Sequence, residues 1–160
     1  MPLYQNILLI AFSLAFILTP LIRVLAFRFN LLDHPKAHGI HSKPVPRIGG
    51  IAIYFAFVAG ALWQMDLSQQ LKGVLVGSTI IFLTGLCDDL FKLKAKVRLL
   101  IQIIALAIMM FKYGVVLDIF ENKVLNGFFT ALGIIGVTNA VNFLDNMDGL
   151  ATGLVMISSA

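Results

Sequence analysis

Charged side chains are scarce in this 160-residue sequence. They make up 12% of its residues, compared with about 25% in soluble proteins. Hydrophobic residues make up 59%, and the mean hydropathy is +0.95. This composition excludes a disordered chain and a soluble enzyme, and it predicts a membrane protein.

Cysteine is almost absent as well. Cys87 is the single one, which excludes an internal disulfide framework. The excess of basic over acidic residues, 12 against 8, is modest and needs no nucleic acid to explain it. We therefore expect a lipid bilayer, and no nucleic acid, as a partner of this chain.

Charge-free runs mark the predicted membrane spans, each of which needs roughly 20 apolar residues. They predict helices over residues 3–25, 49–65, 73–87 and 124–144. A run over 99–111 is shorter and crosses only if flanking Lys and Arg side chains reach the interface. A sixth run begins at Gly149 and stops at Ala160. We expect an all-α polytopic membrane protein of about five to six transmembrane helices. It would form one domain over residues 1–160, truncated in mid-helix.

Polar segments separate these runs. Residues 27–47 contain three prolines and one glycine, which break helices, so we expect a loop there. Residues 64–72 predict a short polar turn, and 88–98 a charged segment. The connector over 112–123 has a pattern that suits a small hairpin.

The distribution of basic residues predicts the topology. If the first helix runs from outside to inside, nine of the twelve basic residues lie on the inner side. This agrees with the positive-inside rule and places the N-terminus outside. The segments over about 28–48, 88–98 and 142–149 then become cytoplasmic loops, and the most polar parts of the chain share one membrane face.

The first of these polar segments to suggest chemistry is Asp88-Asp89-Leu90-Phe91-Lys92. Two adjacent carboxylates repel each other unless a cation is near, and Mg²⁺ prefers such oxygen ligands. A continuing helix would place Lys92 beside both carboxylates. The alternative is an interfacial salt-bridge stripe with Lys94, Lys96 and Arg98.

A second polar group recurs every three residues as Asn139, Asn142, Asp145 and Asp148, followed by Gly149. Asp145 and Asp148 would be neighbours on one helix face, and the glycine predicts a break or cap. Carboxylate and amide oxygens crowded at a helix break favour a metal or polar-ligand site. The alternative is a capped helix end whose carboxylates are solvated.

The third segment is His41-Ser42-Lys43-Pro44-Val45-Pro46-Arg47-Ile48-Gly49-Gly50. Its prolines stiffen the backbone, and its glycines allow close approach of a ligand. Lys43 and Arg47 could hold phosphate oxygens. The alternative is a basic cytoplasmic loop that ends in a Gly-Gly helix start. On one membrane face, the three segments together suit Mg²⁺-assisted chemistry on a phosphorylated substrate.

In three blocks that follow one another along the chain, His41–Gly50, Gly85–Gln102 and Asn139–Gly149, the sequence resembles the polyprenyl-phosphate N-acetylhexosamine-1-phosphate transferases of glycosyltransferase family 4. The Pro44-Val45-Pro46-Arg47 form is closer to the undecaprenyl-phosphate GlcNAc-1-phosphate branch than to the phospho-MurNAc-pentapeptide branch. The resemblance covers only the N-terminal half of such enzymes. It implies transfer of a sugar-1-phosphate, most closely GlcNAc-1-phosphate, from a UDP-sugar to undecaprenyl phosphate, with release of UMP.

The resemblance also implies roles for single residues. Asp145 would be a ligand of Mg²⁺, with Mn²⁺ as an alternative ion, and Asp148 would support that site. Asp88 and Asp89 would either bind metal or deprotonate the lipid phosphate, and Lys92 would steady phosphate charge. The substrate-binding set would comprise His41, Lys43, Arg47, Asn139 and Asn142.

The resemblance places the enzyme in a bacterial inner membrane, as a multi-pass protein with a cytoplasmic active site. It would catalyse the first membrane step of cell-envelope polysaccharide synthesis, such as cell-wall or lipopolysaccharide assembly, and a homodimer is left open. Because the sequence matches half of the family's length, we expect little activity from the chain alone. A non-catalytic truncated membrane subunit, a transporter module and a MurNAc-pentapeptide transferase are the competing hypotheses.

Overall fold

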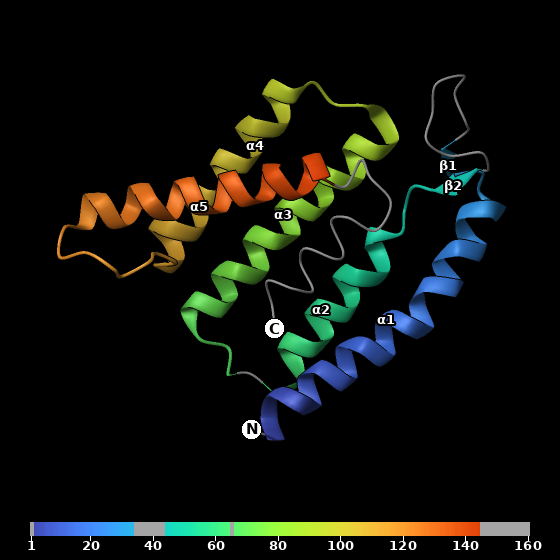
Figure 1. Ribbon diagram of the computed structural model, residues 1–160, viewed down its shortest axis with the longest axis horizontal. Coiled ribbons are helices and arrows are strands. Elements are labelled where there is room, and N and C mark those ends of the chain that lie inside the picture. The colour runs from blue at the N-terminus through green and yellow to red at the C-terminus, as the bar shows by residue number, and fades with distance from the viewer. Residues whose placement is uncertain (1, 34–43, 65, 145–160) are drawn as a thin grey trace.

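The charge-free runs fold into helices, because a helix satisfies its backbone polar groups internally where no water is present. The computed structural model describes residues 2–33, 44–64 and 66–144. Its helices are α1 (Pro2–Arg28), α2 (Gly50–Gln64), α3 (Gln69–Phe91), α4 (Ala95–Ala107), the π-helical turn η1 (Ile108–Lys112) and α5 (Lys123–Leu144) (Figure 1). The predicted helical class is confirmed.

Three helices in the described part of the chain are long and apolar enough to cross a membrane. They are the segments Gln5–Arg28, Gln69–Phe91 and Lys123–Phe143. Helix α2 is apolar but shorter, with 15 residues. Helices α4 and η1 follow each other without a break from Ala95 to Lys112. The predicted total of five to six spans and the external N-terminus remain predictions, and the sixth predicted span lies outside the described residues.

Helices that are consecutive in the chain run in alternating directions and pack as neighbours. Helix α1 packs along α2, and α3 packs against α4 and η1, while α5 contacts α4 (Figure 1). Gly73 and Gly77 let α3 approach the end of η1 closely. A Cβ atom at Gly73 would lie 2.5 Å from the Cβ of Tyr113, and one at Gly77 would overlap the side chain of Met109.

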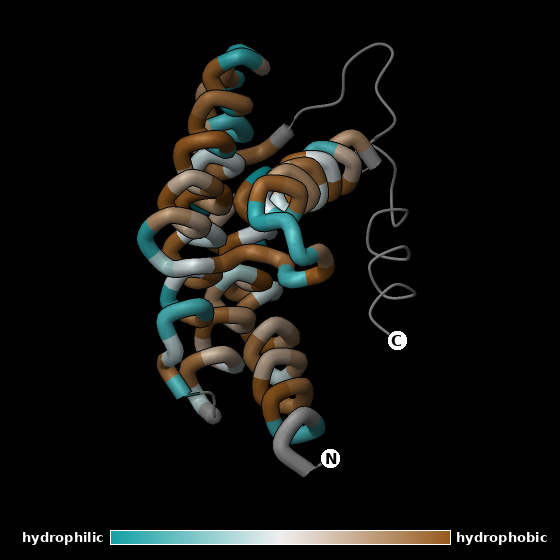
Figure 2. Tube along the Cα trace, turned by 90° about the vertical axis from the view of Figure 1, so that its left-hand side faces the viewer, coloured by the Kyte–Doolittle hydropathy of each residue, from teal (hydrophilic) through white to brown (hydrophobic). Residues whose placement is uncertain are grey.

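The buried apolar side chains are mostly small, as in other membrane helix bundles. Alanines dominate the set, which comprises Ala26, Ile48, Ala52, Ala56, Ala61, Ala105, Leu106 and Met109. Large apolar side chains such as Phe16, Phe111 and Phe128 are exposed. Figure 2 shows hydrophobic colour along the helices and hydrophilic colour largely at their ends and connections. This surface is suited to lipid.

Several predicted boundaries are corrected by the helix ends. Helix α3 begins at Gln69, where the Ser68 hydroxyl accepts the Leu71 N–H at 3.2 Å, so the polar turn is shorter than the predicted 64–72. The charged segment 88–98 is mostly helical, because α3 ends at Phe91 and α4 begins at Ala95. Residues 142–144 likewise belong to α5 rather than to a loop. Charged and polar side chains are accommodated at these helix ends without loop backbone, as in the pair of Arg98 and Asp88 between α4 and α3.

A short antiparallel ribbon forms where only a loop was predicted. Strand β1 (Leu32–Asp33) pairs with β2 (Val45–Pro46), with Leu32 opposite Pro46. Pro46 has no N–H to donate and is tolerated because a two-stranded ribbon has only edge strands. The Arg47 N–H extends the pairing by donating to the Leu31 carbonyl at 3.1 Å. The ribbon therefore fixes the backbone around Arg47.

The predicted hairpin over 112–123 is wrong. No strand occurs between Gly114 and Asn122, all of which the structure describes. The connector follows α5 instead, because its N–H groups find side-chain acceptors there. Leu117 N–H donates to the Thr130 hydroxyl at 2.9 Å, and Phe120 N–H donates to Asn126 Oδ1 at 2.8 Å.

Candidate functional site

The ends of four helices gather on one side of the bundle. The C-terminal ends of α1 and α3 and the N-terminal ends of α2 and α4 all lie toward the top and right of Figure 1. This arrangement results from the alternating helix directions. It brings Arg47 of the proline-rich segment and the acidic pair at the end of α3 to the same end of the bundle, as the distribution of basic residues predicted.

Asp88 lies in the last turn of α3 and is held by a cation from α4. Arg98 Nη1 donates to Asp88 Oδ2 at 2.8 Å, and the two side chains are 28% and 21% exposed, respectively. The pair closes the turn between the two helices. The competing interpretation of a salt-bridge stripe is therefore realised at Arg98.

Arg47 connects the proline-rich segment directly to the acidic one. Its Nη1 donates to the backbone carbonyl of Asp89 at 3.2 Å, across 42 positions of sequence. The last carbonyls of a helix lack intrahelical partners and carry partial negative charge, so a guanidinium is favourable there. The neighbouring Ile48 is buried, with 6% exposure, and anchors this stretch.

Lys92 does not occupy the predicted helical position beside Asp88 and Asp89. Helix α3 ends at Phe91, and Lys92 caps it in the left-handed region, with φ 52° and ψ 70°. Its backbone N–H donates to the Asp88 carbonyl at 2.8 Å. The continuing helix that would have placed Lys92 beside both carboxylates does not form, because the chain turns back toward α4 within three residues. The exposed Lys92 side chain still lies at the same end of the bundle.

Asn139, from the polar group at the end of α5, is bonded to α4. Its Nδ2 donates to Gln102 Oε1 at 2.7 Å and to the Ile135 carbonyl at 2.8 Å. Gln102 is buried, with 6% exposure, and no role was predicted for it. Its place in the sequence could have indicated a structural role, because uncharged polar side chains within an apolar run such as 99–111 commonly form hydrogen bonds between helices.

The remaining predicted site residues are placed only in part. Asn142 is exposed near the end of α5. His41, Lys43, Asp145 and Asp148 lie outside the described residues. Within the described ranges, no group of three or more His, Cys, Asp or Glu side chains could hold a metal ion. The predicted metal site therefore depends on Asp145 and Asp148 and stays a prediction.

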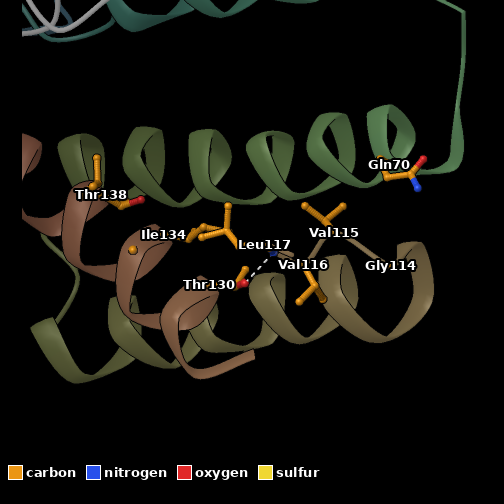
Figure 3. A pocket seen from close by; sticks show the side chains of 10 residues that line it. Gln70, Gly114, Val115, Val116, Leu117, Thr130, Ile134 and Thr138 are labelled. Carbon is orange, nitrogen blue, oxygen red and sulfur yellow. Dashed lines mark hydrogen bonds between the residues drawn. The ribbon is translucent and has the colours of Figure 1, made fainter. Parts of the chain in front are cut away.

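An apolar cavity of about 540 Å³ lies away from the charged helix ends. Residues 114–117 of the connector, Gln70 of α3 and one face of α5 from Thr130 to Thr138 line it (Figure 3). Sequence reasoning did not predict this cavity, because it forms where the connector lies between helices distant in sequence.

Known proteins resemble this chain over most of its length. Residues 71–160 match the family "Glycosyl transferase family 4". A probable undecaprenyl-phosphate N-acetylglucosaminyl 1-phosphate transferase of Bacillus subtilis is 37% identical, covering 88% of this chain and 42% of the relative. An undecaprenyl-phosphate alpha-N-acetylglucosaminyl 1-phosphate transferase of Thermotoga maritima is 30% identical, covering 91% and 47%.

A third relative carries a different name. The phospho-N-acetylmuramoyl-pentapeptide-transferase of Wolbachia pipientis is 30% identical over 79% of this chain and 45% of the relative. The chain thus spans less than half the length of the relatives described here. No solved structure matches it. The family expected from the three polar segments is confirmed: the chain belongs to glycosyl transferase family 4.

Proposed function

We propose that this chain is part of an enzyme that transfers GlcNAc-1-phosphate from UDP-GlcNAc to undecaprenyl phosphate. The products are undecaprenyl-diphospho-GlcNAc and UMP. The observation that carries the proposal is the contact between Arg47 and the acidic end of α3, which unites two of the three polar segments. The names of the relatives from Bacillus subtilis and Thermotoga maritima support the choice of sugar and lipid.

The reaction requires the chain to hold two phosphorylated substrates together. An oxygen of the lipid phosphate would attack the sugar-linked phosphorus of UDP-GlcNAc, and the bond from that phosphorus to the UMP oxygen would break. The charge of the attacking and leaving groups must be neutralised for this to occur. Lys43, Arg47 and Lys92 would supply positive charge, and His41 would lie near the same phosphates.

The acidic pair would divide its tasks. Asp88 is engaged by Arg98 at 2.8 Å, so we propose that it orients that guanidinium. Asp89, the more exposed of the two residues, would face the substrates and accept the proton of the lipid phosphate or bind metal. Asn142 would orient the nucleotide, and Asn139 would contribute at most its carbonyl oxygen, because its amide nitrogen donates within the bundle.

A divalent cation would complete the site. We propose Asp145 and Asp148 as the residues that hold Mg²⁺, or Mn²⁺ in its place. When bound, the ion would neutralise diphosphate charge. The proposed enzyme is a multi-pass protein of the bacterial inner membrane with its site in the cytoplasm, and a homodimer is compatible with it.

A chimaera tests this function directly. Residues 1–160 would replace the matching part of the Bacillus subtilis relative, and membranes would be assayed for labelled lipid formed from UDP-GlcNAc, undecaprenyl phosphate and Mg²⁺. We expect transfer that requires the lipid phosphate and releases UMP. An Asp89→Asn chimaera is the matched inactive control.

The same assay separates the competing functions. UDP-MurNAc-pentapeptide in place of UDP-GlcNAc should give no lipid product, and preferential use of it would assign the chain to the other branch. A chimaera that folds and inserts but transfers neither sugar would favour a non-catalytic membrane subunit.

A further inference from the structure

The amide pair of Gln102 and Asn139 has a role that the proposed chemistry does not use. The two side chains meet between α4 and α5, with 2.7 Å from Asn139 Nδ2 to Gln102 Oε1. The second hydrogen of the same Nδ2 goes to the Ile135 carbonyl, one turn earlier in α5. Asn139 is therefore fixed on its own helix and on its neighbour at once.

This bond joins two helices that otherwise share little surface. Helices α4 and α5 contact each other less extensively than α3 and α4 do. In a bilayer, apolar contacts between helices favour one rotation of a helix about its axis only weakly, because an apolar face can contact lipid equally well. A directed bond that a buried glutamine, only 6% exposed, accepts from Asn139 distinguishes one rotation of α5 from the others.

The rotation of α5 matters because Asn142 lies on the same helix, close to Asn139. The three-residue separation corresponds on an α-helix to a rise of about 4.5 Å and a turn of about 300°. A side-chain end lies about 5–6 Å from the helix axis, so turning α5 by about 20° would move it by roughly 2 Å. Displacements of about 1 Å in an active site can lower rates on the order of a hundredfold.

We propose that Gln102 is a positioning residue that sets the rotation of the C-terminal part of α5 and thereby the direction of Asn142. The effect of Gln102 on catalysis rests on the proposed function. Its effect on the rotation of α5 does not depend on that function. Asn139 is then a structural partner rather than a substrate ligand through its amide nitrogen.

Double electron–electron resonance on the chain in lipid nanodiscs tests whether Gln102 sets the rotation of α5, because it measures the distance between two spin labels. Spin labels would be attached to cysteines at Leu100 of α4 and Ala140 of α5, both exposed, in a background where the exposed Cys87 is replaced by serine. The wild-type pair should give a narrow distance distribution. Gln102→Leu removes the acceptor and should broaden or shift the distribution, whereas Ile103→Leu, on the adjacent exposed residue, should not.

A swap distinguishes a direct bond from a general packing effect. The double variant Gln102→Asn with Asn139→Gln keeps two amides and the combined side-chain length, so it should restore the narrow distribution. An unchanged distribution in Gln102→Leu overturns the proposal. A well-folded swap that stays broad overturns it as well. Should Gln102→Leu not fold, Asn139→Leu removes the same bond from the other helix.

The catalytic consequence is measured in the chimaera. Gln102→Leu should lower kcat/KM about tenfold to a hundredfold, and the swap should recover most of that loss. If the wild-type chimaera shows no transfer at all, the proposed function fails while the distance measurements still decide the role of Gln102. Full activity in Gln102→Leu, together with a broadened distribution, would overturn the link to Asn142.

Discussion

Substitution of Asp88 tests separately how its ion pair with Arg98 contributes to stability and to transfer activity. Asp88→Asn removes the carboxylate charge and keeps the side-chain shape. The two side chains meet at 2.8 Å, and two unit charges about 4 Å apart attract by about 1 kcal/mol in water and by about 4 kcal/mol at an effective dielectric constant of 20. Because both side chains are about a quarter exposed, with 28% and 21% accessibility, we expect solvent screening to keep the coupling near 1 kcal/mol.

The assay is a double-mutant cycle of Asp88→Asn, Arg98→Gln and the double variant. The free energy of unfolding would be measured by titration with dodecyl sulfate in mixed micelles, and transfer would be measured in the chimaera. We expect a coupling energy of about 1 kcal/mol. Asp88→Asn should lower transfer about tenfold, and Asp89→Asn should lower it on the order of a hundredfold or more, as expected for loss of a general base.

Two results would refute this reasoning. A coupling energy above about 3 kcal/mol would mean that the pair is shielded from solvent far more than its exposure indicates. Equal losses of transfer in Asp88→Asn and Asp89→Asn would show that the two carboxylates do not divide their tasks as proposed.

Three further substitutions test other parts of the structure. Asn126→Ala removes the acceptor of two connector N–H groups and the donor to the Phe120 carbonyl; it should lower the free energy of unfolding by about 2–3 kcal/mol, whereas Asn122→Ala, at the exposed start of α5, should lower it by about 1 kcal/mol. Gly77→Leu should destabilise the chain by about 1–3 kcal/mol, because the Met109 side chain must move away from the added atoms, and the same titration checks it. Arg47→Ala should lower transfer by the chimaera about a hundredfold with little change in unfolding, so wild-type transfer would remove Arg47 from the site.

The helices and the shared location of two of the three polar segments were predictable, because both depend on where charge is absent. Long apolar runs must form helices in a bilayer, and alternating directions bring Arg47 to Asp89 despite their separation in sequence. The left-handed cap at Lys92 was not predictable, since it depends on where α4 docks. The connector was mispredicted for a similar reason. Its backbone N–H groups donate to Asn126 and Thr130 of α5 rather than to a second strand.

The sequence identified several residues of the candidate site, but it did not identify the hydrogen bonds and ion pairs that they form. The pattern identified Asn139, but not that Gln102 binds it, because one glutamine in an apolar run has no unique partner in sequence. Asp88 was correctly placed at a helix end, and the structure pairs it with Arg98, a member of the alternative salt-bridge stripe, rather than with Lys92. Both pairings are choices among nearby partners, and such choices are made by packing rather than by sequence spacing.

The π-helical turn η1 has a consequence for how this segment can change in length. A π turn holds one residue more than an α turn, so deleting a residue between Ile108 and Lys112 would leave a regular α-helix there. Because the π turn and the α turn that would replace it each complete about one revolution, the residues after the deletion would keep nearly the same direction around the axis. A single deletion should therefore be tolerated better within Ile108–Lys112 than within Ala95–Ala107, where the loss of one residue would turn the following segment and its connector by about 100°.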